Sequence, residues 1–318
     1  MPKFKFGKEA GIFLLLVVLC VVVTVMNPRF LSPINVQNTA RLIGMFGILS
    51  LGLAVVIVTG GIDLSVGSLV ALLGALLSIG LVDKHMSPVV VVVGVLLVGA
   101  GLGLVHGLLV TRAKLQPFIV TLCGLLIYRG AARFVAEDQS KGFGDSAGFM
   151  WLHDLAVGNF LGVPWPFVIF AVFAVALGVL LHKSVYGRYL YAIGRNPEAA
   201  RYSGVNVKRV ETLAYVVAGG FTAVAAILFA FYTNSISPSS HGNFYELYAI
   251  AAAVLGGFSL RGGEGSVVGV VLGAILLQIL QNLVNLLGIP SSLNFAVMGA
   301  VILLGVLADN LVLRRKQA

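Results

Sequence analysis

The sequence has little charge for its length, and this shortage excludes most water-soluble architectures. Only 10% of its 318 residues are Asp, Glu, Lys or Arg, whereas 59% are hydrophobic, and the mean hydropathy is +1.03. A water-soluble domain of this size cannot bury so large an apolar fraction. We therefore expect most of the chain to lie in a lipid bilayer.

Cysteine is scarce, and the sequence motifs of nucleotide hydrolysis and metal-dependent catalysis are missing. The two cysteines, Cys20 and Cys123, lie in apolar runs, which argues against a disulfide framework and a zinc site. The chain has no G-x-x-x-x-G-K-[ST] loop for nucleotide phosphates and no H-E-x-x-H segment. We therefore expect a chain that is not an enzyme, with no catalytic residue, no metal site and no cofactor of its own.

Long apolar runs, separated by short polar segments, predict an all-α integral membrane protein with about ten spans. A span needs roughly 20 mostly apolar residues, and backbone groups in lipid must find hydrogen-bond partners within the protein, which favours helices. The predicted spans are Gly11–Met26, Leu42–Val58, Ser65–Val82, Val89–Val110, Pro117–Val135, Pro164–Leu181, Glu211–Thr233, Tyr245–Phe258, Ser266–Leu287 and Ser292–Val312.

The basic residues set the expected orientation. With an even number of spans and both termini in the cytosol, most of the 21 Lys and Arg residues fall on the cytosolic side, as the positive-inside rule requires. The net charge of +9 is thus a sign of topology, and we expect no nucleic-acid partner. We expect a single membrane domain, 1–318, with a cytosolic N-terminus (1–10), a periplasmic loop (136–163), a cytosolic loop (182–210) and a cytosolic C-terminus (313–318).

Small residues recur at four-residue spacing in several spans, which allows two helix backbones to approach closely in a membrane. The fourth span has one such series, Gly99, Gly103 and Gly107. We expect this face to pack against another helix, either in the same subunit or in a second copy of the chain. A glycine-lined substrate path is the alternative.

The cytosolic loop contains a short helix whose two ends are marked by the sequence. Asn196 can cap the N-terminus, Pro197 suits the first turn, and Glu198 complements the helix dipole. Gly204 can adopt the left-handed conformation that ends a helix. In a chain without a motor, a capped helix outside the membrane is suited to contact a separate cytosolic ATPase; a simple interfacial helix is the alternative.

The start of the third span carries an ionisable residue, Asp63, close to apolar surroundings. Ionisable groups within a bilayer are the default candidates for function. Together with Thr59, Gly61 and Ser65, Asp63 could form a broken-helix site on a translocation pathway. Asp63 or Ser65 could instead cap the third span, and the two roles are compatible.

A double glycine followed by an acidic residue opens two of the predicted spans. Residues 60–67 precede the third span, and residues 262–269 precede the ninth. Internal repeats are common in transporter folds, so this similarity is consistent with a repeat, although a glycine-rich chain also produces it by chance.

The ninth span has three amides on one helical face. Gln278, Asn282 and Asn285 lie at positions i, i+4 and i+7. Amides donate and accept hydrogen bonds, so they suit a neutral polyol as well as a neighbouring helix. Both uses, pathway lining and contact between helices, remain open.

Few other charged or titratable groups lie near the spans. Arg129 and Arg133 fall at the outer end of the fifth span, and we expect their side chains to extend to the membrane surface. Glu246 begins the eighth span and could cap it or pair with one of these arginines. His106 lies within the fourth span, where a packed neutral imidazole is the expected state.

Four stretches of the chain follow one another in a specific order. They are residues 59–68 (TGGIDLSVGS), residues 118–122 (FIVTL) with Arg129-Gly130, residues 187–204 (GRYLYAIGRNPEAARYSG) and residues 245–257 (YELYAIAAAVLGG). In this order they resemble the membrane permease subunits of ribose-type bacterial ABC sugar importers. The resemblance runs from about Asn27 to Asn310.

This resemblance implies partners and a site. It implies a homodimeric permease in the bacterial inner membrane, working with two copies of a cytosolic ATPase that binds ATP and Mg²⁺ and with a periplasmic sugar-binding protein. The cargo would be a monosaccharide, ribose or another pentose or hexose. The residues that would contact the ATPase are Gly194, Asn196, Pro197, Glu198, Ala199, Ala200, Arg201 and Gly204.

Two positions depart from the family pattern, and other transporter classes remain possible. Tyr248 stands where an acidic residue often follows Tyr-Glu-Leu, and Arg195 stands where a glycine is usual. An ion-driven secondary transporter would need paired carboxylates or histidines in the spans, and this chain has few. An ABC permease for branched-chain amino acids is a further alternative, because such permeases share a shorter form of the 61–67 motif.

Overall fold

Long apolar helices make up most of the chain in the computed structural model. The structure describes residues 6–144 and 147–290, together with residues 293, 296, 299, 300 and 303. Within these residues, eight helices are long and apolar enough to cross a membrane. They are α1 (Phe6–Met26), α2 (Pro33–Ile57), α3 (Val66–Ser78, continued by a π-helical turn, Ile79–Asp83), α4 (Pro88–Thr111), α5 (Pro117–Val135), α7 (Trp165–Lys183), α10 (Val207–Thr233) and α12 (Val267–Leu286).

Shorter elements connect these helices. The short helices are α6 (Met150–Val157), α8 (Val185–Arg195), α9 (Pro197–Tyr202) and α11 (Tyr245–Leu255), with 3-10 turns at Pro28–Leu31 and Ala147–Phe149. The strands are β1 (Lys141–Gly142), β2 (Asn159–Phe160), β3 (Val163–Pro164) and β4 (Ser235–Ile236). β1 pairs antiparallel with β4 and β2 with β3, so the outer loop is fastened to the end of α10.

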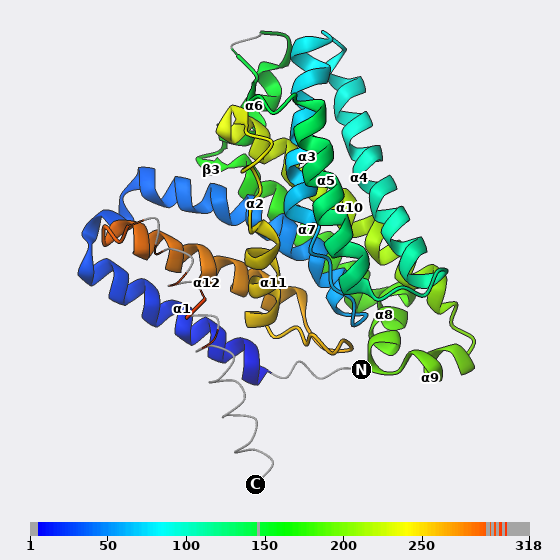
Figure 1. Cartoon of the computed structure of the whole chain (residues 1–318). Helices are drawn as coiled ribbons and strands as arrows, with labels where there is room; N and C mark the ends of the chain where they lie inside the picture. Colours follow the sequence, from blue (N-terminus) through cyan, green and yellow to red (C-terminus); the bar gives the residue numbers. More distant parts are fainter. Residues whose placement is uncertain are drawn as a thin grey trace.

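The interior of the bundle is formed by α2, α3 and α10, which are buried over most of their length. α10 packs against α4 and α2, α3 packs against α5, and α2 also contacts α7, α11 and α12 (Figure 1). The helices α1, α4, α5 and α7 expose apolar faces, including Phe13, Leu97, Ile127 and Val175. Exposed apolar faces of this extent suit lipid, so the prediction of an all-α, multi-pass membrane protein is confirmed.

One predicted span is wrong. The run Tyr245–Phe258 forms only the 11-residue helix α11, which is about 16 Å long and covers about half of a hydrocarbon core. The preceding non-helical segment descends from the outer end of α10 to the start of α11 (Figure 1). Apolar composition alone cannot distinguish a spanning helix from a half-helix with a buried extended segment before it. The tenth predicted span, Ser292–Val312, lies almost entirely outside the described residues.

The glycine series of α4 packs against α10 of the same subunit, which confirms the packing interpretation of this face. A Cβ on Gly103 would lie 2.9 Å from the carbonyl carbon of Tyr215, and one on Gly107 would lie 2.7 Å from Thr212 Cα. The two backbones are therefore in direct contact, with no room for side chains between them. One turn after Gly107, at the end of α4, the hydroxyl group of Thr111 lies 2.9 Å from that of Thr212 on α10.

The α4–α10 contact gives a stability prediction. Gly103→Leu places a side chain against the α10 backbone, and the overpacking should lower the free energy of unfolding by about 1–3 kcal/mol. Gly101→Leu is the matched control, because a Cβ at Gly101 meets no atom within 4 Å. The measurement is the Tm of both purified variants in the same detergent. Equal Tm values would contradict a close backbone contact at Gly103.

Candidate functional site

The predicted short helix of the cytosolic loop is α9, and its ends are closed by local hydrogen bonds. Asn196 Oδ1 accepts a hydrogen bond from Ala199 N at 2.9 Å. Gly204 has a φ of 83°, and Val205 N donates to the Ala200 carbonyl at 3.1 Å, which completes the C-terminal end. These local interactions define the helix independently of any partner.

α9 projects from the bundle with most of its surface exposed (Figure 1). Glu198 and Arg201 are exposed, Tyr202 is 89% exposed, and Ala200 is buried. An exposed tyrosine on a capped helix provides a contact surface for another protein, because Tyr is enriched in protein–protein interfaces. The geometry therefore suits the predicted contact with a partner.

Gly194, at the end of α8, packs against the membrane-embedded part of the chain. A Cβ on Gly194 would lie 3.0 Å from Gly263 Cα, and Gly263 N donates to the Val58 carbonyl at 2.8 Å. A Cβ on Gly262 would lie 2.7 Å from Gly60 N. The two double-glycine segments noted in the sequence thus meet each other, and Gly194 of α8 lies against Gly263 of the second segment.

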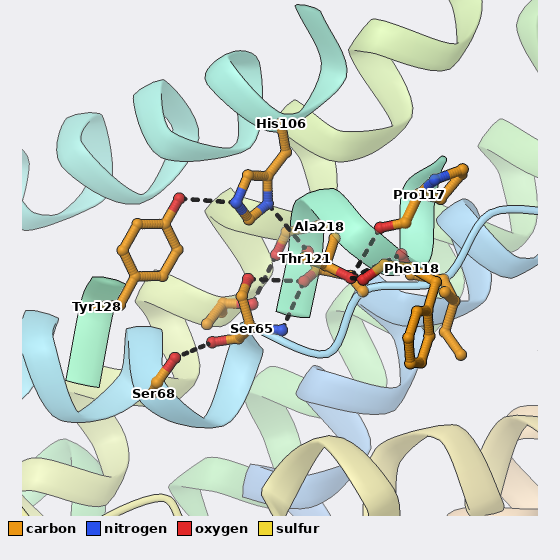
Figure 2. A network of polar contacts seen from close by, with 11 residues as sticks. Ser65, Ser68, His106, Pro117, Phe118, Thr121, Tyr128 and Ala218 are labelled. Carbon is orange, nitrogen blue, oxygen red and sulfur yellow. Dashed lines mark hydrogen bonds and ion pairs between the residues drawn. The ribbon is translucent and has the colours of Figure 1, made fainter. Parts of the chain in front are cut away.

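A buried polar network lies at the start of α3 (Figure 2). Asp63 Oδ1 accepts hydrogen bonds from Ser65 N at 2.8 Å and Ser65 Oγ at 2.6 Å. His106 Nδ1 of α4 lies 3.8 Å from Asp63 Oδ2, and His106 Nε2 is 2.9 Å from the Tyr128 hydroxyl of α5. These four side chains are buried, so the network joins three helices in the interior.

Asp63 lies just before α3 and accepts hydrogen bonds from Ser65, the residue that precedes the helix, and from no amide within α3. Ser65 forms no side-chain cap of its own; its hydroxyl donates to Asp63. Thr59 donates its hydroxyl proton to the Val56 carbonyl at the end of α2. Gly61 packs against the hydroxyl group of Tyr215. A substrate contact by these residues stays a prediction.

Tyr215 of α10 belongs to the same interior region, and sequence reasoning missed it. The tyrosine is 1% exposed, and its hydroxyl has no hydrogen-bond partner among the described residues. Its ring lies edge-on to His106, with ring centroids 6.5 Å apart. The only signal in the sequence was a tyrosine within an otherwise apolar span, which is too common to single out.

The side chain of Arg129 is held within the protein, and its extension to the membrane surface stays a prediction. Arg129 Nη1 donates to the carbonyls of Pro238 at 3.0 Å and His241 at 2.7 Å. Both carbonyls belong to the non-helical segment before α11, where the backbone lacks helical partners. Arg129 therefore supplies hydrogen bonds to irregular backbone that is buried within the protein.

Glu246 and Arg133 occupy different environments. Glu246 is 7% exposed in the first turn of α11, close enough to Arg129 for electrostatic attraction and in contact with Gly67 in the first turn of α3. A carboxylate at two helix N-termini is stabilised by both dipoles. Arg133 is exposed, and its Nε donates to Asp138 Oδ1 at 2.6 Å; this hydrogen bond lowers the pKa of Asp138.

The three amides of α12 do not share one environment. Asn282 exchanges two hydrogen bonds with Asn35 of α2, at 3.1 and 2.8 Å. Gln278 is buried and Asn285 is exposed. Contact between helices is therefore the role of Asn282 in this structure, and pathway lining by the amides stays a prediction.

An aromatic cluster near these amides was also missed. Phe46 of α2 lies 4.8 Å from Tyr245 and 5.5 Å from Tyr248, both of α11, measured between ring centroids. Tyr248 also shares a hydrogen bond with Gln281 of α12. These three rings are half-buried, and rings beside an amide are typical of small-molecule sites. The spacing of Tyr245 and Tyr248, three residues apart, was the available signal.

Fold and site together define a class of protein. It is a multi-pass helical membrane protein in which non-helical segments interrupt the interior of the bundle and a capped helix projects from it. Residues 35–306 match the family described as the permease component of the branched-chain amino acid transport system. The chain belongs to this family of bacterial inner-membrane permeases. No solved structure matches the chain.

Several curated relatives extend over almost the whole chain. The ribose import permease protein of Bacillus subtilis is 40% identical over 98% of this chain and 94% of its own length. That of Escherichia coli K12 is 39% identical over 93% and 91% of the two chains. The L-arabinose ABC transporter permease protein of Azospirillum brasilense is 32% identical over 95% and 87%.

The network at the start of α3 gives a second stability prediction. Tyr128→Phe leaves His106 Nε2 without its partner in a buried site, which should cost about 1–3 kcal/mol of stability. Tyr189→Phe on α8, where the ring is 39% exposed, is the control. Thermal unfolding of both variants in detergent is the measurement. A Tyr128→Phe protein as stable as the Tyr189→Phe protein would show that the network adds nothing to stability.

Proposed function

We propose that the chain is the membrane permease subunit of an ATP-driven importer that carries a monosaccharide, with ribose as the first candidate, into the cytoplasm. The observation that carries this proposal is the near full-length similarity to ribose import permeases at 37–40% identity. The similarity to an L-arabinose permease supports a pentose over a branched-chain amino acid.

The energy for transport would come from a separate cytosolic ATPase that contacts α9. The chain itself contributes neither ATP-binding loop nor Mg²⁺ site in this proposal. α9 suits the role because it is exposed, capped at both ends and connected through α8 to the segments that precede α3 and α12. A second copy of the permease and a periplasmic sugar-binding protein complete the proposed importer.

An ion-coupled secondary transporter is not favoured. Such a protein needs a buried titratable group that can bind and release an ion during transport. Asp63 is held by Ser65 at the N-terminus of α3, and Arg129 is bound to backbone carbonyls. Both groups therefore already have structural partners.

The test of this proposal is reconstitution in liposomes with the cognate ATPase and binding protein. We expect ribose, presented by the binding protein, to stimulate ATP hydrolysis and to accumulate inside the vesicles. The permease alone, given only a proton or sodium gradient, should accumulate nothing. Uptake by the permease alone would contradict the proposal that a separate ATPase supplies the energy for transport.

A second test concerns α9. Glu198→Lys combined with Tyr202→Ala changes two exposed side chains of α9 without changing its caps. Loss of interface contacts of this kind typically weakens binding about tenfold or more, and sugar-stimulated hydrolysis should fall accordingly. Glu137→Lys, an exposed charge reversal in the outer loop, is the control. Unchanged coupling in the α9 variant would exclude α9 from the ATPase contact.

A further inference from the structure

A hollow of about 540 Å³ lies beside α9 on the cytosolic side. Its walls are the turn between α4 and α5, one face of α9 and the first turn of α10. In Figure 1, α9 lies at the same end of the molecule as the junction of α4 and α5. The transport proposal above does not use this hollow.

The hollow is lined by more positive than negative charge. Lys114 comes from the α4–α5 turn, Arg201 from α9 and Lys208 from α10, whereas Glu211 is the one carboxylate in the lining. Arg201 and Glu211 attract each other electrostatically, and among the described residues the lining carries three cationic side chains against this one carboxylate. Lysines brought together from two separate segments form a site for an anion.

Apolar surface adjoins the hollow on its membrane side. Leu115 lines the hollow and is 47% exposed. Leu109 near the end of α4, and Phe118 and Ile119 in the first turn of α5, are also exposed. Apolar side chains at the end of a span contact acyl chains, so the cations lie where the head groups of these lipids would be.

We propose that this hollow binds the phosphate group of an anionic phospholipid from the cytosolic leaflet. Lys114 and Lys208 contact the phosphate, and the acyl chains lie against Leu115 and the exposed first turn of α5. The bound lipid connects the α4–α5 turn to α10 and, through Arg201, to α9. The lipid composition of the membrane therefore influences the position of the helix proposed to contact the ATPase.

An alternative ligand for the hollow, an acidic segment of the ATPase, is less consistent with the geometry. Pro197 and Arg201, four residues apart on α9, line the hollow. Glu198 and Tyr202 are exposed and do not line it. α9 thus offers a second surface to a protein partner, while the hollow opens beside the exposed apolar ends of α4 and α5.

The experiment uses the purified full-length permease alone, without ATPase or binding protein. Electron paramagnetic resonance measures how spin-labelled phosphatidylglycerol and phosphatidylcholine partition onto the protein in phosphatidylcholine vesicles. Each lysine near a membrane surface contributes roughly fivefold to the binding of an anionic lipid. We expect a clear preference for phosphatidylglycerol that falls by more than that factor for each lysine of the hollow removed, because direct contact with the phosphate adds to the general surface attraction.

The variant is Lys114→Gly combined with Lys208→Gln. Lys114 has a φ of 57°, a left-handed conformation that glycine adopts without strain, so its removal does not disturb the turn. Lys183→Gln combined with Arg209→Gln is the matched control, because both side chains are exposed, basic and cytosolic but lie outside the hollow. The control removes the same number of positive charges from the same surface, so it should lose only the general electrostatic attraction that every basic residue near the membrane provides. Phosphatidylcholine binding should be equal in all three proteins.

Two results would overturn the proposal. In the first, the Lys114→Gly/Lys208→Gln protein keeps the wild-type preference for phosphatidylglycerol. In the second, the permease alone shows no preference, but the same variant binds the ATPase more weakly than the control does, which would assign the hollow to the protein partner. Neither result depends on whether the importer carries sugar, so failure of this proposal and failure of the transport proposal are distinguishable.

Discussion

The direct backbone contact between α4 and α10 is the constraint on which the interior of this protein depends. Gly103 and Gly107 leave no side-chain layer between the two helices, and Thr111 and Thr212 fix their register by a hydrogen bond. In lipid there is little hydrophobic driving force between helices, so van der Waals packing of small residues must supply the association. His106, one position before Gly107, is thereby directed away from α10's backbone and toward Asp63 and Tyr128.

The same requirement for internal partners explains why the few charges of the interior lie where they do. The chain departs from helix between α2 and α3 and again between α10 and α11. Asp63 binds the backbone N–H of Ser65 at the first break, and Arg129 binds the carbonyls of Pro238 and His241 at the second. At each break, a charged side chain supplies hydrogen bonds to backbone groups that have no helical partner. These charges are thus structural conditions for broken helices.

Local chemistry was predictable from the sequence, and long-range partners were not. The caps of α9 involve Asn196 and Gly204, which lie within a few residues of the groups they satisfy, so the sequence predicts them directly. Arg129 binds carbonyls more than a hundred residues away, and nothing in its neighbourhood on the chain indicates this. The prediction of a spanning helix at α11 was wrong for a related reason. The apolar composition of this segment matches a spanning helix, and its short length is seen only in the structure, where it packs against α2 and α12.

The contacts of the amides of α12 were likewise not predictable from the sequence. Their helical spacing placed Gln278, Asn282 and Asn285 on one face, but a face of a helix can change neighbours along its length. Asn282 meets Asn35 of α2, whereas Asn285, one turn further, is exposed. Periodicity therefore predicts which residues share a direction, and the neighbouring helices decide what each of them contacts.

The meeting of the two double-glycine segments connects these interior features with the cytosolic surface. Gly194 lies against Gly263, Gly263 donates to the Val58 carbonyl, and the segments they belong to lead into α12 and α3. These contacts join backbone to backbone, with no side chain between them that could move aside. α8 and α9 therefore cannot shift toward the bundle without displacing the segments that precede α3 and α12. These backbone contacts join α8, which leads directly into α9, to the segments that precede α3 and α12.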